Sequence, residues 1–113
     1  MKNLLSVLIL VLINFSCSYK NINAEAPIVN EVKLNEKFKI NLPENHTDGY
    51  TWQQKNISLK NINELSQTWR GKEKGIDFNY QSIQNGVDTL IFVKRKHTDT
   101  LETKKFIIKV IIN

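Results

Sequence analysis

The chain has 113 residues, and 16 Lys and Arg against 11 Asp and Glu give a formal charge of +5. The basic residues are interspersed with acidic ones, so the blocks of like charge that are typical of nucleic-acid-binding arms are absent. We therefore expect no nucleic-acid partner. The length allows one small domain able to fold alone, and the single cysteine excludes an intramolecular disulfide.

The N-terminal segment is predicted to be an export signal of the lipoprotein type. Lys2 supplies a positive start, and residues 4–13 form an almost uninterrupted apolar run. A membrane-spanning helix needs about 20 apolar residues, so this run is too short and is typical of a secretory signal over residues 1–16. A small residue followed by the lone Cys17 indicates a bacterial lipoprotein processing site, at which Cys17 would be lipidated.

Residues 17–27 are predicted to be the lipidated cysteine and a polar tether, because residues 18–26 include Asn, Lys and Glu and almost no bulky apolar residue. Stable anchoring takes two or more acyl chains, and bacterial lipidation supplies several. We therefore expect an exported protein that is lipid-anchored through Cys17 to a bacterial membrane or cell surface. Simple cleavage, which would give a secreted or periplasmic protein, is the alternative.

The remaining residues, 28–113, are predicted to form an all-β domain. Several short runs alternate between apolar and polar residues, as half-buried strands do. These runs are residues 29–34, 38–40, 50–53, 76–80 and 87–93. Residues 106–112 are almost continuously β-branched, which favours a strand buried on both faces or at a sheet centre. Residues 57–65 are compatible with a short helical turn.

Turn signals such as Asn85-Gly86 separate these runs at regular spacing. The pattern favours an immunoglobulin-like antiparallel β-sandwich of about seven strands. A small β-barrel is the competing architecture. In either fold we expect Trp69 and Tyr80 to pack in the core.

The most informative motif is Asn-His-Thr-Asp-Gly-Tyr-Thr-Trp at residues 45–52. Asn45 and Asp48 are able to bond their own backbone and fix a turn, and Gly49 permits a positive φ. Thr47 is then expected near the apex, and the two aromatic residues that follow are expected to hold the base of the loop. Such a stiff loop loses little entropy on docking. On spacing alone, an ordinary turn between strands is the simpler explanation.

This motif resembles the signature loop of the chagasin family, inhibitors of papain-type cysteine peptidases, whose usual form is Asn-Pro-Thr-Thr-Gly-Tyr/Phe before a Trp-bearing strand. The order Asn-x-Thr-x-Gly-Tyr-x-Trp agrees position by position, with His46 in place of the family's Pro and Asp48 in place of its second Thr. The resemblance covers roughly residues 32–112 and implies a sandwich that carries three binding loops at one end.

The second and third family loops are matched in position more than in residue type. The Gly-rich second loop corresponds to residues 70–75, where Gly71 and Gly75 remain, although a flexible charged hairpin explains this segment equally well. The Arg-Pro-Trp of the third loop corresponds to residues 95–97, where Lys and His replace Pro and Trp. Aromatic anchors often dominate interface energy, so the lost Trp bears on affinity.

The resemblance implies a reversible, tight-binding inhibitor that occludes the active-site cleft of a papain-like cysteine peptidase with three loops. The implied protease-binding residues are Asn45, His46, Thr47, Asp48, Gly49, Tyr50, Gly71, Gly75, Arg95, Lys96 and His97. A monomer without cofactors is expected. The alternative function is a lipid-anchored immunoglobulin-like binding or assembly module of the cell envelope, without a protease target.

An enzyme is not expected, because the chain lacks the usual catalytic patterns. Its only cysteine is Cys17, so the predicted domain has no Cys–His pair, and no nucleophile elbow, phosphate-binding Gly loop or metal-ligand spacing is present. A metal site from His46, Asp48, His97 and Asp99 would require two loops to converge. Lone loop histidines are usually solvated, so no metal is expected.

Overall fold

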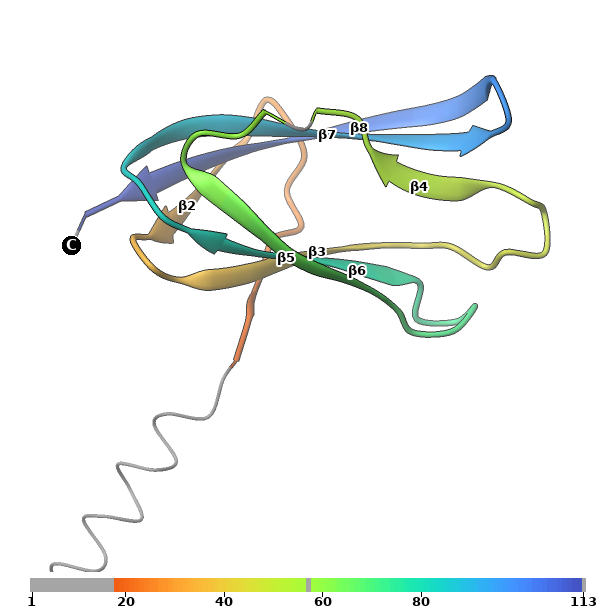
Figure 1. Cartoon of the computed structure of the whole chain (residues 1–113), viewed down its shortest axis with the longest axis horizontal. Helices are drawn as coiled ribbons and strands as arrows, with labels where there is room; N and C mark the ends of the chain where they lie inside the picture. Colours follow the sequence, from red (N-terminus) through yellow and green to blue (C-terminus); the bar gives the residue numbers. More distant parts are fainter. Residues whose placement is uncertain (1–17, 57, 113) are drawn as a thin grey trace, which may run out of the picture.

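The computed structural model describes residues 18–56 and 58–112, which form two packed β-sheets (Figure 1). The predicted signal segment and Cys17 lie outside the described residues. The strands are β1 (Lys20–Asn21), β2 (Val29–Lys33), β3 (Lys37–Leu42), β4 (Thr51–Gln54), β5 (Ile62–Trp69), β6 (Ile76–Ser82), β7 (Gly86–Lys96) and β8 (Asp99–Ile111). Across the described residues, no helix is long and apolar enough to cross a membrane.

The two sheets each have four strands, in the orders β1-β3-β6-β5 and β2-β8-β7-β4. The β3–β6, β5–β6, β4–β7 and β7–β8 pairs are antiparallel, whereas β1–β3 and β2–β8 are parallel. The predicted β-sandwich is confirmed, with eight strands in place of about seven. Its two parallel pairs are made by β1 and β2, which lie at the outer edges of different sheets.

The core lies between the sheets and is built from alternating residues of the long strands. Phe78 of one sheet meets Phe92 of the other with ring centroids 4.7 Å apart, and Phe92 meets Phe106 edge-on at 5.8 Å. Such aromatic pairs add to the apolar burial that holds the sheets together. The fully covered side chains are Phe38, Ile40, Leu42, Phe78, Tyr80, Leu90, Phe92, Ile108, Val32, Val110 and Ser82.

Tyr80 packs in the core as predicted, and its hydroxyl donates a hydrogen bond to Gln54 Oε1 at 2.5 Å. Burial raises the pKa of Tyr80 well above its ordinary value, and the negative charge of Glu64 raises it further. Tyr80 is therefore a neutral hydrogen-bond donor that links the β6 core to β4.

The C-terminal strand differs in part from its prediction. Phe106, Ile108 and Val110 are buried, but Lys109 between them is exposed. β8 lies between β2 and β7 in its sheet, as a central strand should. Only one face of a two-sheet sandwich meets the opposite sheet, so of the two predicted alternatives the central position in a sheet is confirmed and burial on both faces is not.

The predicted tether is partly built into the sandwich. Lys20–Asn21 pairs with β3, the Ile22 amide donates to the Lys39 carbonyl at 3.0 Å, and the Ile22 side chain is buried. The sequence expectation considered polarity alone, whereas one apolar residue and a free sheet edge are enough to capture this segment. Within the tether expected over residues 17–27, residues 20–22 are therefore part of the sandwich and not a free linker.

A helical turn was expected within residues 57–65, but residues 62–65 at the end of this segment form a strand. Ile62 begins strand β5, which pairs with β6 and carries a bulge between Glu64 and Ser66. Cross-strand hydrogen bonding to β6 outweighs the helix-like spacing of apolar residues in this segment. The bulge lies along an outer edge strand, where such irregularities are common.

Candidate functional site

Three loops meet at one end of the sandwich because of the strand register. They are the first loop (residues 43–50, between β3 and β4), the second loop (residues 70–75, between β5 and β6) and the third loop (residues 95–98, the tip of the β7–β8 hairpin). Leu42 pairs with Ile76, which places the first and second loops together. Thr51 pairs with Arg95, which places the first loop beside the third (Figure 1).

The tip of the first loop is shaped by its own side chains. Asn45 Oδ1 accepts the Thr47 amide hydrogen at 3.0 Å, and Asp48 Oδ1 accepts that of Tyr50 at 3.0 Å. Gly49 has a φ of 80°, which a glycine adopts at no steric cost. The predicted turn chemistry of Asn45, Asp48 and Gly49 is therefore confirmed, and Thr47 is exposed at the turn as expected.

The base of this loop is held by Glu44, a buried carboxylate that the sequence reasoning missed. Glu44 is 5% exposed, and its Oε1 accepts the backbone amide hydrogen of buried Trp52 at 2.5 Å. Its Oε2 accepts a hydrogen bond from His46 Nε2. Trp52 Nε1 donates to the Pro43 carbonyl at 2.8 Å. Since a buried charge is costly without partners, these bonds are what keep Glu44 in place.

His46 occupies a backbone conformation that proline is unable to adopt. Its φ is 64°, whereas the proline ring fixes φ near −65°. Replacing the family's Pro with His therefore changes the path of the loop as well as its stiffness. Stiffness is restored by side-chain contacts, because the imidazole bonds to Glu44 and stacks on Trp69.

Trp69 is the residue whose predicted location is wrong. It is 47% exposed rather than packed in the core, and its ring stacks on that of His46 with centroids 4.4 Å apart and planes 15° apart. Its Nε1 donates to the Glu44 carbonyl at 3.3 Å. The reason is that β5 is an outer strand of its sheet, and every residue of it from Asn63 to Trp69 is exposed.

The second loop is a tight hairpin closed by backbone hydrogen bonds. The Arg70 amide donates to the Gly75 carbonyl at 2.7 Å, and the Gly75 amide donates to the Gly71 carbonyl at 2.8 Å. Gly75 is buried with a φ of 74°, and a Cβ there would lie 2.2 Å from the Leu42 carbonyl oxygen. Gly75 thus fixes the junction of two loops and offers no contact surface, whereas Gly71 is half-buried.

The third loop contacts the first through Lys96. The Lys96 Nζ lies 5.9 Å from the centre of the Tyr50 ring, and its chain passes close to Gly49. His97 is exposed at the tip with a φ of 54°. Arg95 is half-buried beside Thr51, and its Nε is buried with no hydrogen-bond partner among the described residues.

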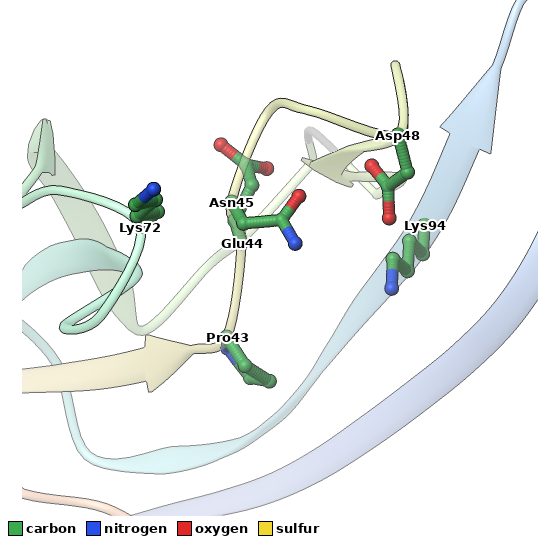
Figure 2. A pocket seen from close by; sticks show the side chains of 6 residues that line it. All are labelled: Pro43, Glu44, Asn45, Asp48, Lys72 and Lys94. Atoms are coloured by element: carbon green, nitrogen blue, oxygen red, sulfur yellow. The ribbon is translucent and has the colours of Figure 1, made fainter.

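A small pocket of about 160 Å³ marks the seam between these elements. Figure 2 shows Lys72 of the second loop on one side of the first loop, and Lys94 of β7 on the other side near Asp48. The lining residues are Pro43, Glu44, Asn45, Asp48, Lys72 and Lys94. Ligand pockets are usually larger and mostly apolar, so this polar seam is not a small-molecule site.

The loops do not assemble a metal site from the residues that the structure describes. Among residues 18–56 and 58–112, no three His, Cys, Asp or Glu side chains are placed to hold a metal ion. His46 is engaged with Glu44 and Trp69, whereas His97 belongs to the exposed tip of a different hairpin.

The structure brings together all eleven predicted site residues, with unequal access. Residues 45–49, Lys96 and His97 are exposed, Tyr50, Gly71 and Arg95 are half-buried, and Gly75 is buried. The sequence reasoning missed Glu44 and misplaced Trp69. A signal for Glu44 was present, since an acidic residue directly before a polar turn is well placed to accept hydrogen bonds from it. No sequence signal marked the exposure of Trp69.

The fold and the site define a class: a small two-sheet sandwich that presents three loops at one end. Residues 31–110 match the model of the Chagasin family peptidase inhibitor I42. The chain therefore belongs to the chagasin family, as the resemblance over residues 32–112 predicted. This is a family of peptidase inhibitors and not of enzymes.

Solved structures with this architecture include a cysteine protease inhibitor from Entamoeba histolytica, EhICP2. It superposes with a TM-score of 0.67 at 13% identity, over 82% of this chain and 93% of that chain. The solution structure of amebosin has a TM-score of 0.59 at 16% identity, over 84% of this chain and 100% of that chain. At these identities the likeness establishes the fold alone. No curated protein matches the sequence.

Proposed function

We propose that this protein is a reversible, tight-binding inhibitor of papain-like cysteine peptidases that occludes the active-site cleft with its three loops. The observation that carries the proposal is the exposed Thr47 turn, flanked by the second and third loops at one end of the sandwich. Membership of a peptidase-inhibitor family and the likeness to a cysteine protease inhibitor support it.

The mechanism is steric. The Thr47 turn enters the cleft beside the catalytic cysteine and histidine of the peptidase, and the other two loops contact the cleft on either side. No cysteine or other activated nucleophile of the described domain takes part, so the complex forms without covalent chemistry. Occupying the cleft is enough to exclude a substrate.

Tight binding follows from preorganisation. The Asn45 and Asp48 side chains, buried Glu44 and the His46–Trp69 stack hold the first loop before any partner arrives. A loop already in its bound shape avoids the ordering cost that weakens flexible binders. We expect an inhibition constant below about 1 μM, which corresponds to about −8 kcal/mol.

The charge of the loop end supports fast encounter with an acidic cleft. Lys72, Lys94 and Lys96 lie at or beside the loops. Complementary charge raises the association rate more than the final affinity.

The test is a titration of papain and of a cathepsin-like peptidase with the full-length chain. The proposal predicts reversible inhibition that competes with substrate, and an unchanged inhibitor mass after recovery. Papain whose catalytic thiol carries a small blocking group should still bind the chain. Absence of inhibition of both enzymes at micromolar concentration would refute the proposal.

Lipid anchoring through Cys17 is the second part of the proposal, and it rests on the sequence of residues 1–17. Since β1 begins at Lys20, only two residues separate the proposed lipidated cysteine from the sandwich. The domain would then stay close to the membrane surface. Replacement of Cys17 by Ala should move the protein from the membrane fraction to the soluble fraction, and a wild-type protein that is already soluble would contradict the idea.

A further inference from the structure

The half-exposed Trp69 ring is the feature that the proposed mechanism leaves without a use. Trp side chains are highly buried on average, whereas Trp69 is 47% exposed. Trp69 lies directly before the second loop and carries one face against His46 of the first loop. It is therefore an apolar surface placed between two of the loops that are proposed to grip a peptidase.

The Trp69 side chain is held ready for a partner. The stack on His46, with ring centroids 4.4 Å apart, covers part of the ring, and the bond from Nε1 to the Glu44 carbonyl at 3.3 Å fixes its orientation. The ring thus has its polar atom engaged while 47% of the residue stays exposed. Docking an apolar surface on it would release water without the cost of ordering the side chain.

The rest of the loop end offers little apolar surface by comparison. The exposed residues of the third loop are Lys96, His97 and Thr98, and those of the second loop are Arg70, Lys72, Glu73 and Lys74. Leu101 is the other large apolar side chain exposed near this end, on β8. Trp is the residue type most enriched among energetic hot spots.

We propose that Trp69 is the principal apolar anchor of this inhibitor, and that it packs against an apolar wall of the peptidase cleft on the side of the second loop. The proposal rests on the proposed function and deepens it. It makes the second-loop side, rather than the third loop, the side that decides which papain-like peptidases are bound tightly.

The alternative is that Trp69 only braces the first loop by stacking on His46. The two roles differ in what the variants do. If Trp69 contacts the peptidase, Trp69→Ala should weaken inhibition of papain by roughly 30-fold or more, the range of an interface hot spot. His46→Ala removes the stack but leaves the exposed ring, so its effect should be clearly smaller.

Val87→Ala is the matched control, because Val87 is also an exposed apolar residue but lies at the start of β7, the end opposite the third loop. Its inhibition constant should stay within about threefold of wild type, since truncations outside an interface core are usually near neutral. Urea unfolding of each variant checks that the sandwich remains intact.

A direct readout comes from fluorotryptophan incorporated into the full-length chain and observed by ¹⁹F NMR. The chain has two tryptophans, and Trp52 is 3% exposed, so the two signals report a buried and an open ring. Trp69→Phe assigns them. Adding papain with a blocked catalytic thiol should shift the Trp69 signal and remove its sensitivity to a dissolved quencher, while the Trp52 signal changes little.

The proposal is overturned if the wild type inhibits papain but Trp69→Ala inhibits equally well. It is also overturned if His46→Ala matches Trp69→Ala and the Trp69 signal stays open to the quencher, because the ring then acts only as a brace. A wild type that inhibits neither papain nor a cathepsin-like enzyme would be a different result, since it refutes the proposed function itself.

Discussion

The first and third loops lie side by side but are built by different means. The first loop is held by side-chain hydrogen bonds from Asn45 and Asp48, by a buried carboxylate at Glu44 and by an aromatic stack. The third loop is the bare tip of a hairpin, where His97 is exposed. The hairpin owes its shape to the strands, whereas the first loop owes its shape to its own residues.

This difference teaches where the sequence tolerates change. A loop that is held by specific side chains loses its shape when one of them is replaced. A hairpin tip between the paired strands β7 and β8 depends less on its own side-chain contacts, so a lost aromatic at His97 is expected to alter contact surface more than architecture. We therefore expect substitutions in and beneath the first loop to matter far more than those in the third.

The largest effect is expected at the backbone junction beneath the first loop. Gly75→Ala places a Cβ 2.2 Å from the Leu42 carbonyl oxygen, so the backbone must shift. Gly71→Ala meets nothing within 4 Å and carries only the strain of its φ of 98°, about 1–3 kcal/mol. Urea unfolding should show a greater loss for Gly75→Ala than for Gly71→Ala. Equal losses would mean that the two loops are not locked together there.

Removal of the buried carboxylate should give the next largest effect. Glu44→Ala leaves the buried Trp52 amide without its acceptor, which costs about 1–3 kcal/mol of unfolding free energy. Inhibition of papain should weaken as well, because His46 loses its partner. Glu73→Ala is the control, since Glu73 is exposed in the second loop. Comparable stability of the two variants would show that Glu44 does not hold the loop.

Replacing the two histidines one at a time compares the first and third loops most directly. His46→Ala removes the contact to Glu44 and the stack on Trp69, and should weaken inhibition of papain by about tenfold, or about 1.4 kcal/mol. His97→Ala removes only an exposed ring and should change the inhibition constant by less than about threefold. A larger effect at His97 than at His46 would reverse the proposed ranking of the loops.

The smallest effect is expected away from the loops, at Tyr80. Because burial raises the pKa of Tyr80, the folded state favours the neutral hydroxyl. This contribution to stability is complete below about pH 10, the ordinary pKa of tyrosine, and is lost as the pH rises beyond that value. As the pH rises from neutral to strongly alkaline, the unfolding free energy of Tyr80→Phe should fall by less than that of wild type. Parallel pH profiles would contradict the assignment.

Much of the fold and the outline of the site are predictable from the sequence, because period-two runs and turn chemistry are local properties. Asn45, Asp48 and Gly49 determine their turn within a few residues, and their roles are predicted correctly. Burial at a loop end is different, since it depends on which sheet edge reaches that end. Trp69 has the large apolar side chain that is typical of a core, but it belongs to an edge strand that is exposed from Asn63 onward.

The expected tether was predicted without its short strand at Lys20–Asn21 for a similar reason. Its polarity indicates a tether, but Ile22 finds a free edge of β3 and is buried there. Edge pairing needs a compatible neighbour in space, which the local sequence does not reveal. Glu44 is an intermediate case, because the acceptor was visible in the sequence but the buried Trp52 amide that it binds was not.

The most direct test of the central claim replaces Thr47-Asp48-Gly49 with a neutral linker of equal length and measures inhibition of papain beside wild type. We predict reversible inhibition by wild type, a loss of at least about 100-fold in the variant, and an unchanged urea midpoint, because the exposed turn contributes contact and not core. Equal inhibition by both proteins would contradict the account.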